Sequence, residues 1–391
     1  SETISLVVES NTDLYMSEEN IYLTYTESVD EWEIQQEIVM EKMMPLIGEE
    51  DKEIIEKIKR TDNDVLSNEE KKQKIRQIAS KYIAYMDQEE RENFYDEVEL
   101  ELKERLEEYE YMEYTIINKV RVNGLNVDVD ANGKVPGSIM NQFSMDEDEG
   151  VFRIATTLSR RWNSFEKEST ESTNHVFTLN ENLKMMDHLK DIAEGETIYS
   201  TRFIDDKLYM VTFKQVDPFF VIDLEDPNDI ETLGELKIPG FSRYLHPYDE
   251  DTIIGIGRDA TETGRTKGLK ISLFDVSDFE NPEEVANFVT DERYASSIAE
   301  YEHKAFLFSK EKNLLVIPAY NYDYEGDDSY NGAMVFDISK DGIEVRGLID
   351  HGTKQYGSSV ERSLYIEDML YTKSPGLLRI NSIEDLESVK D

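Results

Sequence analysis

Hydrophobic and polar residues alternate along most of this chain in short β-rich runs that are separated by turn residues. Five segments share one pattern, in which a hydrophobic strand is followed by an acidic or asparagine turn and a second short strand. They are VFTLNENLKMMDHL (176–189), FVIDLEDPNDIETLGEL (220–236), SLFDVSDFENPEEVANFV (272–289), MVFDISKDGIEVRGLI (334–349) and the weaker copy LLRINSIEDLESV (377–389).

A second series of β-rich runs precedes the first: GVFRIATT, KLYMVTF, TIIGIG, LLVIPAY and MLYTKS. A further candidate strand precedes each of these: NQFSM, YSTRFI, SRYLHPY, HKAFLFS and RSLYIE. The unit is therefore four short antiparallel strands in roughly 50 residues, which is the pattern of a β-propeller blade. We predict an all-β propeller of about six visible blades with an α-helical insertion. An array of β-sandwiches is the alternative, and the regular four-strand period favours the propeller.

The acidic stretch DEDEG (146–150) lies between the runs NQFSM and VFRIATT. We interpret these runs as the two inner strands of one blade and the acidic stretch as the turn between them, since Gly150 suits a positive φ. The acidic side chains then form a solvated tip. Asp146 and Asp148 are the candidate ligands if the tip instead binds a cation.

The hydrophobic period becomes helical between residues 27 and 113. Three start signals resemble capping boxes, at Asp30-x-x-Glu33, Ser67-x-x-Glu70 and Asp87-x-x-Glu90. We predict three or four helices. Because the strands 20–26 and 113–122 flank this segment, the helices replace a hairpin loop inside the first visible blade. The propeller would comprise residues 1–26 and 114–391, and residues 27–113 would be an acidic helical insert.

The charge of the chain restricts its partners. It has 86 acidic and 42 basic residues and a formal net charge of −44. Nucleic acids and anionic membrane surfaces are excluded as partners, because both require a basic face. The chain has no cysteine, which excludes disulfides and thiolate chemistry. It has no run of 18 apolar residues, so we predict no transmembrane segment.

Long strings in this sequence resemble a known family. They include VPGSIMNQFSMDEDEGVFRIATT, IYSTRFIDDKLYMVTFKQVDPFFVIDLEDP, LGELKIPGFSRYLHPYDEDTIIGIGRDA and GLKISLFDVSDFENP. The chain is similar to the secreted β-propeller family of archaea and some bacteria, whose members are described by a C-terminal β-propeller domain. The resemblance implies secretion or display at the cell surface and further blades upstream. This chain, which begins at Ser1, then looks like the C-terminal part of a larger ring. The family brings no assigned catalytic residue.

DVDANGK (128–134) resembles the beginning of a calcium-binding loop. Asp128, Asp130 and Asn132 occupy its first, third and fifth positions, but the twelfth position is Ile139 where a bidentate glutamate is needed. A turn between two strands is therefore the favoured interpretation. Ca²⁺ is the one cofactor that these acidic segments suggest.

The loop NYDYEGDDSYNG (321–332) is a second candidate binding segment, since long loops at a propeller face often bind ligands. Its acidic residues would bind Ca²⁺, and its tyrosines would present a surface to a sugar or a protein. The alternative is an ordinary exposed loop. The candidate residues are Tyr322, Asp323, Tyr324, Glu325, Asp327 and Asp328.

His246 lies in YLHPYDED, near the predicted channel end of an inner strand. It is a candidate ligand or acid–base group, although a hydrogen-bonded structural histidine is the favoured interpretation. None of the local zinc motifs HxH, HxxxH and HExxH occurs. Arg202, Lys214 and Arg243 are predicted to line the channel.

Three aspartates recur at the same place in successive repeats, namely Asp223, Asp275 and Asp337. We expect each of them to end a strand and to accept hydrogen bonds from backbone N–H groups of the following turn.

The sequence favours an extracellular or cell-surface propeller that binds proteins or glycans, or serves as an assembly scaffold, through face loops and the helical insert. The expected partners are upstream blades of the same precursor or a protein of the cell envelope. Two alternatives stay open. One is an enzyme that acts on polysaccharide or peptide at the channel mouth, and the other is a calcium-dependent structural component of the cell surface.

Overall fold

The computed structural model of this chain describes residues 12–124, 126–163, 168–214, 217–261, 265–291, 295–321, 329–352 and 359–390. The chain divides into two compact units. The first unit comprises Ser1–Thr26, Thr115–Asn163 and Glu168–Asp391, and the second comprises Glu27–Tyr114 with Ser164–Lys167. The sequence prediction had placed the helical insert at residues 27–113.

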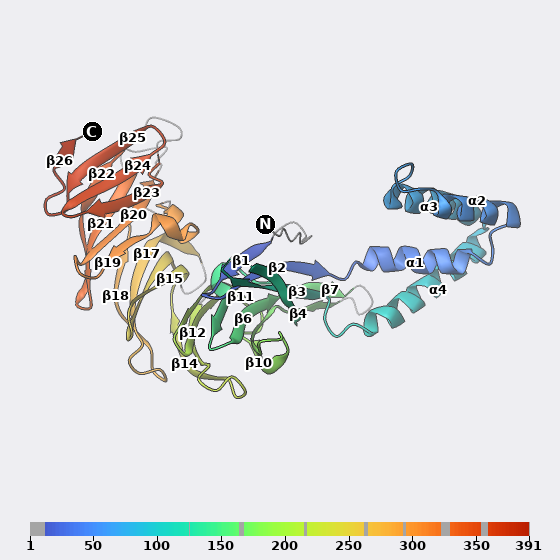
Figure 1. Cartoon of the computed structure of the whole chain (residues 1–391), viewed down its shortest axis with the longest axis horizontal. Coiled ribbons are helices and arrows are strands. Elements are labelled where there is room, and N and C mark those ends of the chain that lie inside the picture. The colour runs from blue at the N-terminus through green and yellow to red at the C-terminus, as the bar shows by residue number, and fades with distance from the viewer. Residues whose placement is uncertain are drawn as a thin grey trace. The chain divides into compact units, whose positions relative to one another are not determined.

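Six four-stranded sheets make up the described part of the first unit (Figure 1). Strands pair in chain order in every sheet, as expected for propeller blades, so the predicted fold class is confirmed. The strands of the first three sheets are β1 (Asp13–Met16), β2 (Asn20–Ser28), β3 (Glu113–Asn123) and β4 (Asn126–Pro136); β5 (Met145–Asp148), β6 (Val151–Leu158), β9 (Thr173–Leu179) and β10 (Met185–Ile192); and β11 (Thr197–Ile204), β12 (Lys207–Phe213), β13 (Asp217–Asp223) and β14 (Glu231–Ile238).

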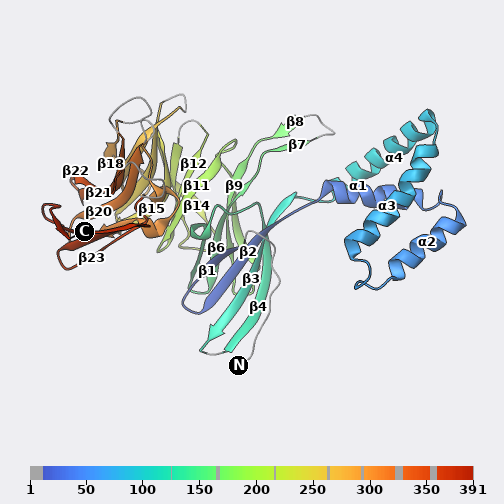
Figure 2. The same cartoon turned by 90° about the horizontal axis from the view of Figure 1, so that it is seen from above.

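The other three sheets continue the same order. Their strands are β15 (Phe241–Asp249), β16 (Thr252–Ala260), β17 (Thr266–Asp275) and β18 (Glu283–Val289); β19 (Leu307–Ser309), β20 (Leu314–Asn321), β21 (Tyr330–Ser339) and β22 (Gly342–Asp350); and β23 (Arg362–Ile366), β24 (Met369–Ser374), β25 (Leu377–Ser382) and β26 (Ser388–Lys390). A separate hairpin of β7 (Arg161–Asn163) and β8 (Glu168–Thr170) interrupts the second sheet and is visible in Figure 2.

Burial of the second strands shows how the sheets pack. In β12, β16 and β20 consecutive residues are buried on both faces of the strand, because a neighbouring sheet covers each face. In β24 of the last sheet only alternate residues are buried. β2 of the first sheet alternates in the same way, between buried and half-buried residues. The end sheets are therefore packed fully on one face only.

The acidic stretch at residues 146–150 is a hairpin tip, as predicted. β5 pairs with β6, and Glu149 and Gly150 form the two-residue turn with φ angles of 47° and 82°. The strand begins at Met145 rather than at Asn141. Residues Gln142–Ser144 instead form a short 3₁₀ helix, which the side chain of Asn141 caps by accepting a hydrogen bond from the N–H of Phe143.

Two predictions about turns were wrong. Residues 128–134 lie inside β4, because the turn of this hairpin falls earlier, where Gly124 has a φ of 62°. Asp337 lies inside β21 and pairs with Arg346, so it caps no turn. Asp223 and Asp275 do end strands, and they accept hydrogen bonds from the N–H groups of Glu225 and Ser277.

The second unit contains four helices among its described residues, shown in Figure 2. They are α1 (Glu31–Met43), α2 (Glu49–Arg60), α3 (Asn68–Tyr85) and α4 (Gln88–Glu107). All three predicted start signals are present, since Asp30, Ser67 and Asp87 cap α1, α3 and α4. The helices pack around an apolar core of their own, which includes Ile38, Ile55 and Val98.

Candidate binding face and its pockets

The long connections of the propeller leave from one edge of its sheets. Because the strands of a sheet are antiparallel, the starts of its first and third strands and the ends of its second and fourth strands lie at the same edge. We call this edge the insertion face. The connections at this edge include residues 29–112, 159–172, 290–306 and 351–361. The opposite edge carries shorter turns, such as 149–150, 205–206 and 250–251.

A cavity of about 350 Å³ opens at the insertion face. Its lining comes from the connection after β4, the end of β6, the beginning of β11 and β15, so four separate segments converge there. We call it the Arg243 cavity. Its lining residues are Ser138, Ile139, Met140, Thr157, Ser159, Thr197, Ile198, Tyr199 and Arg243.

A buried carboxylate lies behind Arg243. Glu300 belongs to the 3₁₀ helix Ile298–Glu300, and its side chain has no exposed surface. Nε of Arg258 lies 3.1 Å from Oε2 of Glu300, and Nε of Arg243 lies 3.7 Å from the same oxygen. Burial raises the pKa of Glu300, and the charges of Arg258 and Arg243 oppose that rise. The cluster thus holds two guanidinium groups against one carboxylate.

His246 lies in a packed interface between two sheets. Its Nδ1 is 3.1 Å from the hydroxyl of Tyr244, and its ring lies 4.9 Å from Phe306 and 5.5 Å from Phe308, measured between centroids. Burial lowers the pKa of His246 to about 4, and the positive charge of Arg202 acts in the same direction. The ring is hydrogen-bonded and packed between aromatic side chains. A role for His246 as a ligand or acid–base group stays a prediction.

The two candidate cation ligands of the acidic turn both lie near Arg153. Asp146 accepts a hydrogen bond of 2.8 Å from Nε of Arg153, its cross-strand neighbour, and a second one from the hydroxyl of Tyr15. Asp148 lies 3.7 Å from Nη1 of the same arginine. The guanidinium group already supplies positive charge to both carboxylates. Cation binding by Asp146 and Asp148 stays a prediction.

The residues of the supposed calcium loop lie on β4. Asp130 accepts a hydrogen bond of 2.7 Å from Arg121, and Asn132 donates one of 2.6 Å to Asn118. Asp128 is exposed. An extended strand spaces these side chains apart, whereas a calcium loop curls them around the ion. In the parts of the chain that the structure describes, no group of three or more His, Asp or Glu side chains is placed to hold a metal ion.

The remaining candidates are the six residues of the tyrosine-rich segment and the predicted channel residues. Tyr322, Asp323, Tyr324, Glu325, Asp327 and Asp328 lie outside the described residues. The described strands on either side, β20 and β21, end and begin at the insertion face. Of the predicted channel residues, Arg202 lies over the ring of Phe143, while Lys214 follows β12, the second strand of its sheet, and forms an ion pair with Glu171.

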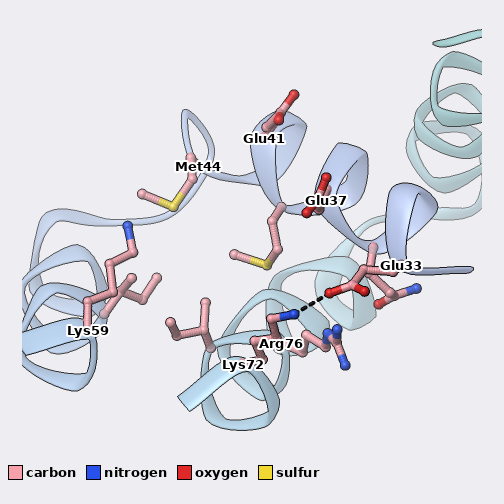
Figure 3. Close-up of a pocket in the computed structure, with 11 residues that line it drawn as sticks. Glu33, Glu37, Glu41, Met44, Lys59, Lys72 and Arg76 are labelled. Atoms are coloured by element: carbon pink, nitrogen blue, oxygen red, sulfur yellow. Dashed lines mark hydrogen bonds and ion pairs between the residues drawn. The ribbon is translucent and has the colours of Figure 1, made fainter. Parts of the chain in front are cut away.

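The helical unit contains a groove of its own, of about 310 Å³ (Figure 3). Apolar side chains from α1, α2 and α3 and from the residue that follows α1 line it: Met40, Ile55, Ile75 and Met44. Glu33, Glu37 and Glu41 follow one edge on α1, and Lys59, Lys72 and Arg76 come from α2 and α3. An ion pair between Lys72 and Glu33 joins the two edges. This groove suits a segment that has an apolar face, with basic side chains on one flank and acidic side chains on the other.

No local signal in the sequence predicts two features of the propeller. His175 and His188 lie on paired strands, with Nδ1 of His175 3.1 Å from Nε2 of His188, and burial lowers the pKa of both rings. They are 13 positions apart, so only the register of β9 with β10 brings them together. The Arg243 cavity likewise depends on the packing of three sheets.

Comparison with known proteins agrees with this architecture. A family model described as a β-propeller domain matches residues 1–386. An uncharacterized protein of Methanocaldococcus jannaschii is 34% identical over 393 residues, covering 99% of this chain and 57% of that protein. An uncharacterized protein of Archaeoglobus fulgidus is 32% identical over 378 residues, covering 96% of this chain and 54% of that protein. This chain therefore spans little more than half the length of either archaeal relative.

A solved structure, the Dos1 propeller, aligns with 71% of this chain and 66% of its own, at a TM-score of 0.44 and 10% identity. Among the described residues, no helix has the length and apolar character that crossing a bilayer requires. The family match over nearly all residues and the six four-stranded sheets lead to one conclusion, that this chain belongs to the β-propeller domain family.

Proposed function

We propose that this chain is an extracellular or cell-surface scaffold that binds envelope proteins or glycans through its insertion face and its helical unit. The observation that carries this proposal is the concentration of long connections, the helical segment included, on one edge of the sheets. A propeller supplies a rigid base, and insertions on one face supply specificity.

The helical groove is the most defined surface of this scaffold for a partner. Its floor is apolar, while its edges carry carboxylates on α1 and cationic side chains on α2 and α3. A partner helix with apolar residues on one stripe and opposite charges on its two flanks would match both edges. Such a segment would bind with its basic flank against Glu37 and Glu41.

The experiment compares the wild-type chain with a variant in which residues 30–111 are replaced by Asn-Gly. Saturable binding to the isolated envelope fraction of the source organism is measured by sedimentation, and thermal melting shows that the propeller still folds. We expect binding at least tenfold weaker in the shortened variant. Met40→Glu in the groove should weaken binding in the same direction, while Leu100→Glu on the exposed face of α4 serves as the matched control. Equal binding by all four proteins would refute the proposal.

A second partner is the remainder of a longer protein. The outward face of the last sheet exposes Leu364, Ile366 and Leu378 by 50%, 58% and 49%. Three further apolar residues lie on the same face. Met369 is the cross-strand neighbour of Ile366, and Tyr371 is that of Leu364. Ile380 is the cross-strand neighbour of Tyr371 and lies two positions after Leu378. Inner sheets cover the equivalent faces, and an uncovered apolar sheet face of this kind marks an interaction surface.

The two archaeal relatives are longer, since this chain covers only 57% and 54% of them. We propose that the remainder of such a longer protein forms a further propeller sheet, which covers that face. The test is Ile366→Lys in this chain and in a natural full-length protein. In this chain the substitution should change the melting temperature little, because the side chain is exposed. In the longer protein it should lower the melting temperature clearly, whereas Asp341→Lys at an exposed turn should not. An equal effect of Ile366→Lys in both proteins would exclude a covering sheet.

A further inference from the structure

Arg243 shares the carboxylate of Glu300 with a second arginine, Arg258. Arg258 engages Glu300 through Nε, and its other two nitrogens donate to the carbonyl of Ala295 and to Oγ of Ser296. The N–H of Ser297 also donates to Glu300, at 3.2 Å. Nε of Arg243 is buried, and among the described residues it has no hydrogen-bond partner. Among the residues that the structure describes, this cluster therefore holds one positive charge in excess.

An incompletely paired guanidinium is unexpected in this composition. The chain has 86 acidic and 42 basic residues, so carboxylates are abundant. Leaving a buried N–H without an acceptor costs free energy, about 1–3 kcal/mol or more for a charged group. The buried Nε lies toward Glu300, at 3.7 Å, so a ligand would meet the exposed part of this guanidinium instead. The excess positive charge of the cluster favours an anion in the adjoining cavity, which Arg243 also lines.

Aromatic rings hold the guanidinium of Arg243 in place. Its Cζ lies 5.2 Å from the ring centroid of Tyr199, 5.0 Å from that of Phe241 and 4.9 Å from that of Tyr301. Three aromatic rings at these distances restrict the movement of the guanidinium and attract its positive charge. The side chain is thus oriented before any ligand arrives, and 24% of its surface is exposed.

The cavity beside this guanidinium has the size and lining of a small-ligand site. Its volume of about 350 Å³ falls within the range of about 300–1,000 Å³ that ligand pockets occupy. Hydroxyl groups line it at Ser138, Thr157, Ser159 and Thr197, and apolar surface comes from Ile139, Met140, Ile198 and Tyr199. The cavity therefore offers one guanidinium, several hydroxyl-bearing side chains and one aromatic ring. These groups suit a small ligand that has several hydroxyl groups and one carboxylate.

We propose that the Arg243 cavity binds an acidic monosaccharide of the hexuronic type, with its carboxylate on Arg243 and its ring against Tyr199. A carboxylate matches the paired N–H groups of a guanidinium, and this charge-assisted contact is stronger than a neutral hydrogen bond. Thr197, which is exposed and lines the cavity, is the residue that we expect to contact a sugar hydroxyl. This site is separate from the groove of the helical unit, so it stands independently of the scaffold function.

The experiment is isothermal titration of the whole chain with glucuronate, glucose and acetate at constant ionic strength. We expect glucuronate to bind, glucose to bind at least tenfold more weakly, and acetate to bind more weakly than glucuronate. Arg243→Gln should weaken glucuronate binding at least tenfold. Arg265→Gln makes the same charge change in a separate cavity of the insertion face and should leave binding unchanged.

Thr197→Val supplies a second variant that does not disturb the buried cluster, because Thr197 is exposed at the beginning of β11. It should weaken glucuronate binding without changing acetate binding. Four results would overturn the proposal: no binding of glucuronate by the wild type, equal binding of glucose and glucuronate, equal losses in Arg243→Gln and Arg265→Gln, or acetate that binds as tightly as glucuronate. If acetate bound as tightly as glucuronate, the cavity would bind carboxylates without recognising the sugar.

Discussion

His246 makes the stability of the propeller depend on pH in a way that can be calculated. Its pKa in the folded chain is about 4, while an unfolded chain has an ordinary histidine pKa of about 6.5. The lowered folded pKa means that the unfolded state binds the proton more readily. The contribution of His246 is therefore fully present above pH 6.5 and is lost as the pH falls toward 4.

The size of this loss follows from the two pKa values. Between pH 7.5 and pH 5 the unfolded ring takes up its proton while the folded ring stays neutral, and this costs about 2 kcal/mol at about 1.4 kcal/mol per pH unit. In His246→Gln the group cannot titrate, so this pH-dependent loss disappears. We expect the free energy of unfolding of the wild type, relative to His246→Gln, to fall by about 2 kcal/mol over this range.

Urea unfolding at pH 7.5 and pH 5 measures the effect in both proteins. Taking the difference between them removes the titration of all other groups, including the 86 acidic residues. Tyr244→Phe is the matched control, because it removes the hydroxyl that lies 3.1 Å from Nδ1 while the histidine still titrates. Its difference from the wild type should change little with pH. A difference between wild type and His246→Gln that stays constant within about 0.5 kcal/mol would refute the burial argument.

Three further substitutions test the packing. Phe336→Ala removes a fully buried ring between two sheets and should cost about 3–5 kcal/mol in urea unfolding, whereas Leu364→Ala on the exposed face should cost less than about 1 kcal/mol. Gly257→Ala would place a methyl group against the backbone of Phe241 and Ser242, so we expect it to lower the free energy of unfolding by about 1–3 kcal/mol. The same change at the open position Gly376 should be nearly neutral. Equal effects at the two positions would contradict this geometry. Ser67→Ala removes the capping box of α3 and should lower the stability of the helical unit by about 1 kcal/mol, measured by the melting of its helical circular dichroism, and an unchanged melting temperature would show that the cap contributes nothing.

Local signals predicted most of the fold, because most of its contacts are local. Each sheet consists of consecutive strands, so a hairpin such as 145–158 can be predicted from alternating residues and a turn with Gly150. The capping residues Asp30, Ser67 and Asp87 likewise act within one turn of their helices.

The errors arose where a local preference competed with pairing to a neighbouring strand. Residues 128–134 have the composition of a turn, yet they extend the ladder with β3 because Gly124 turns the chain earlier. Asp337 repeats the position of Asp275, but Arg346 on the neighbouring strand takes its carboxylate. The Arg243 cavity was beyond prediction, since Ser138, Thr197 and Arg243 meet only after three sheets have packed.

The two ends of the helical segment lie next to each other. The N–H of Val29 donates to the carbonyl of Met112 at 2.8 Å, so both ends of an insert of more than eighty residues meet as the two sides of one hairpin do. β2 and β3 remain neighbours in their sheet across this interruption. A single genetic insertion or deletion at this position would therefore add or remove a complete domain without shifting the register of any strand.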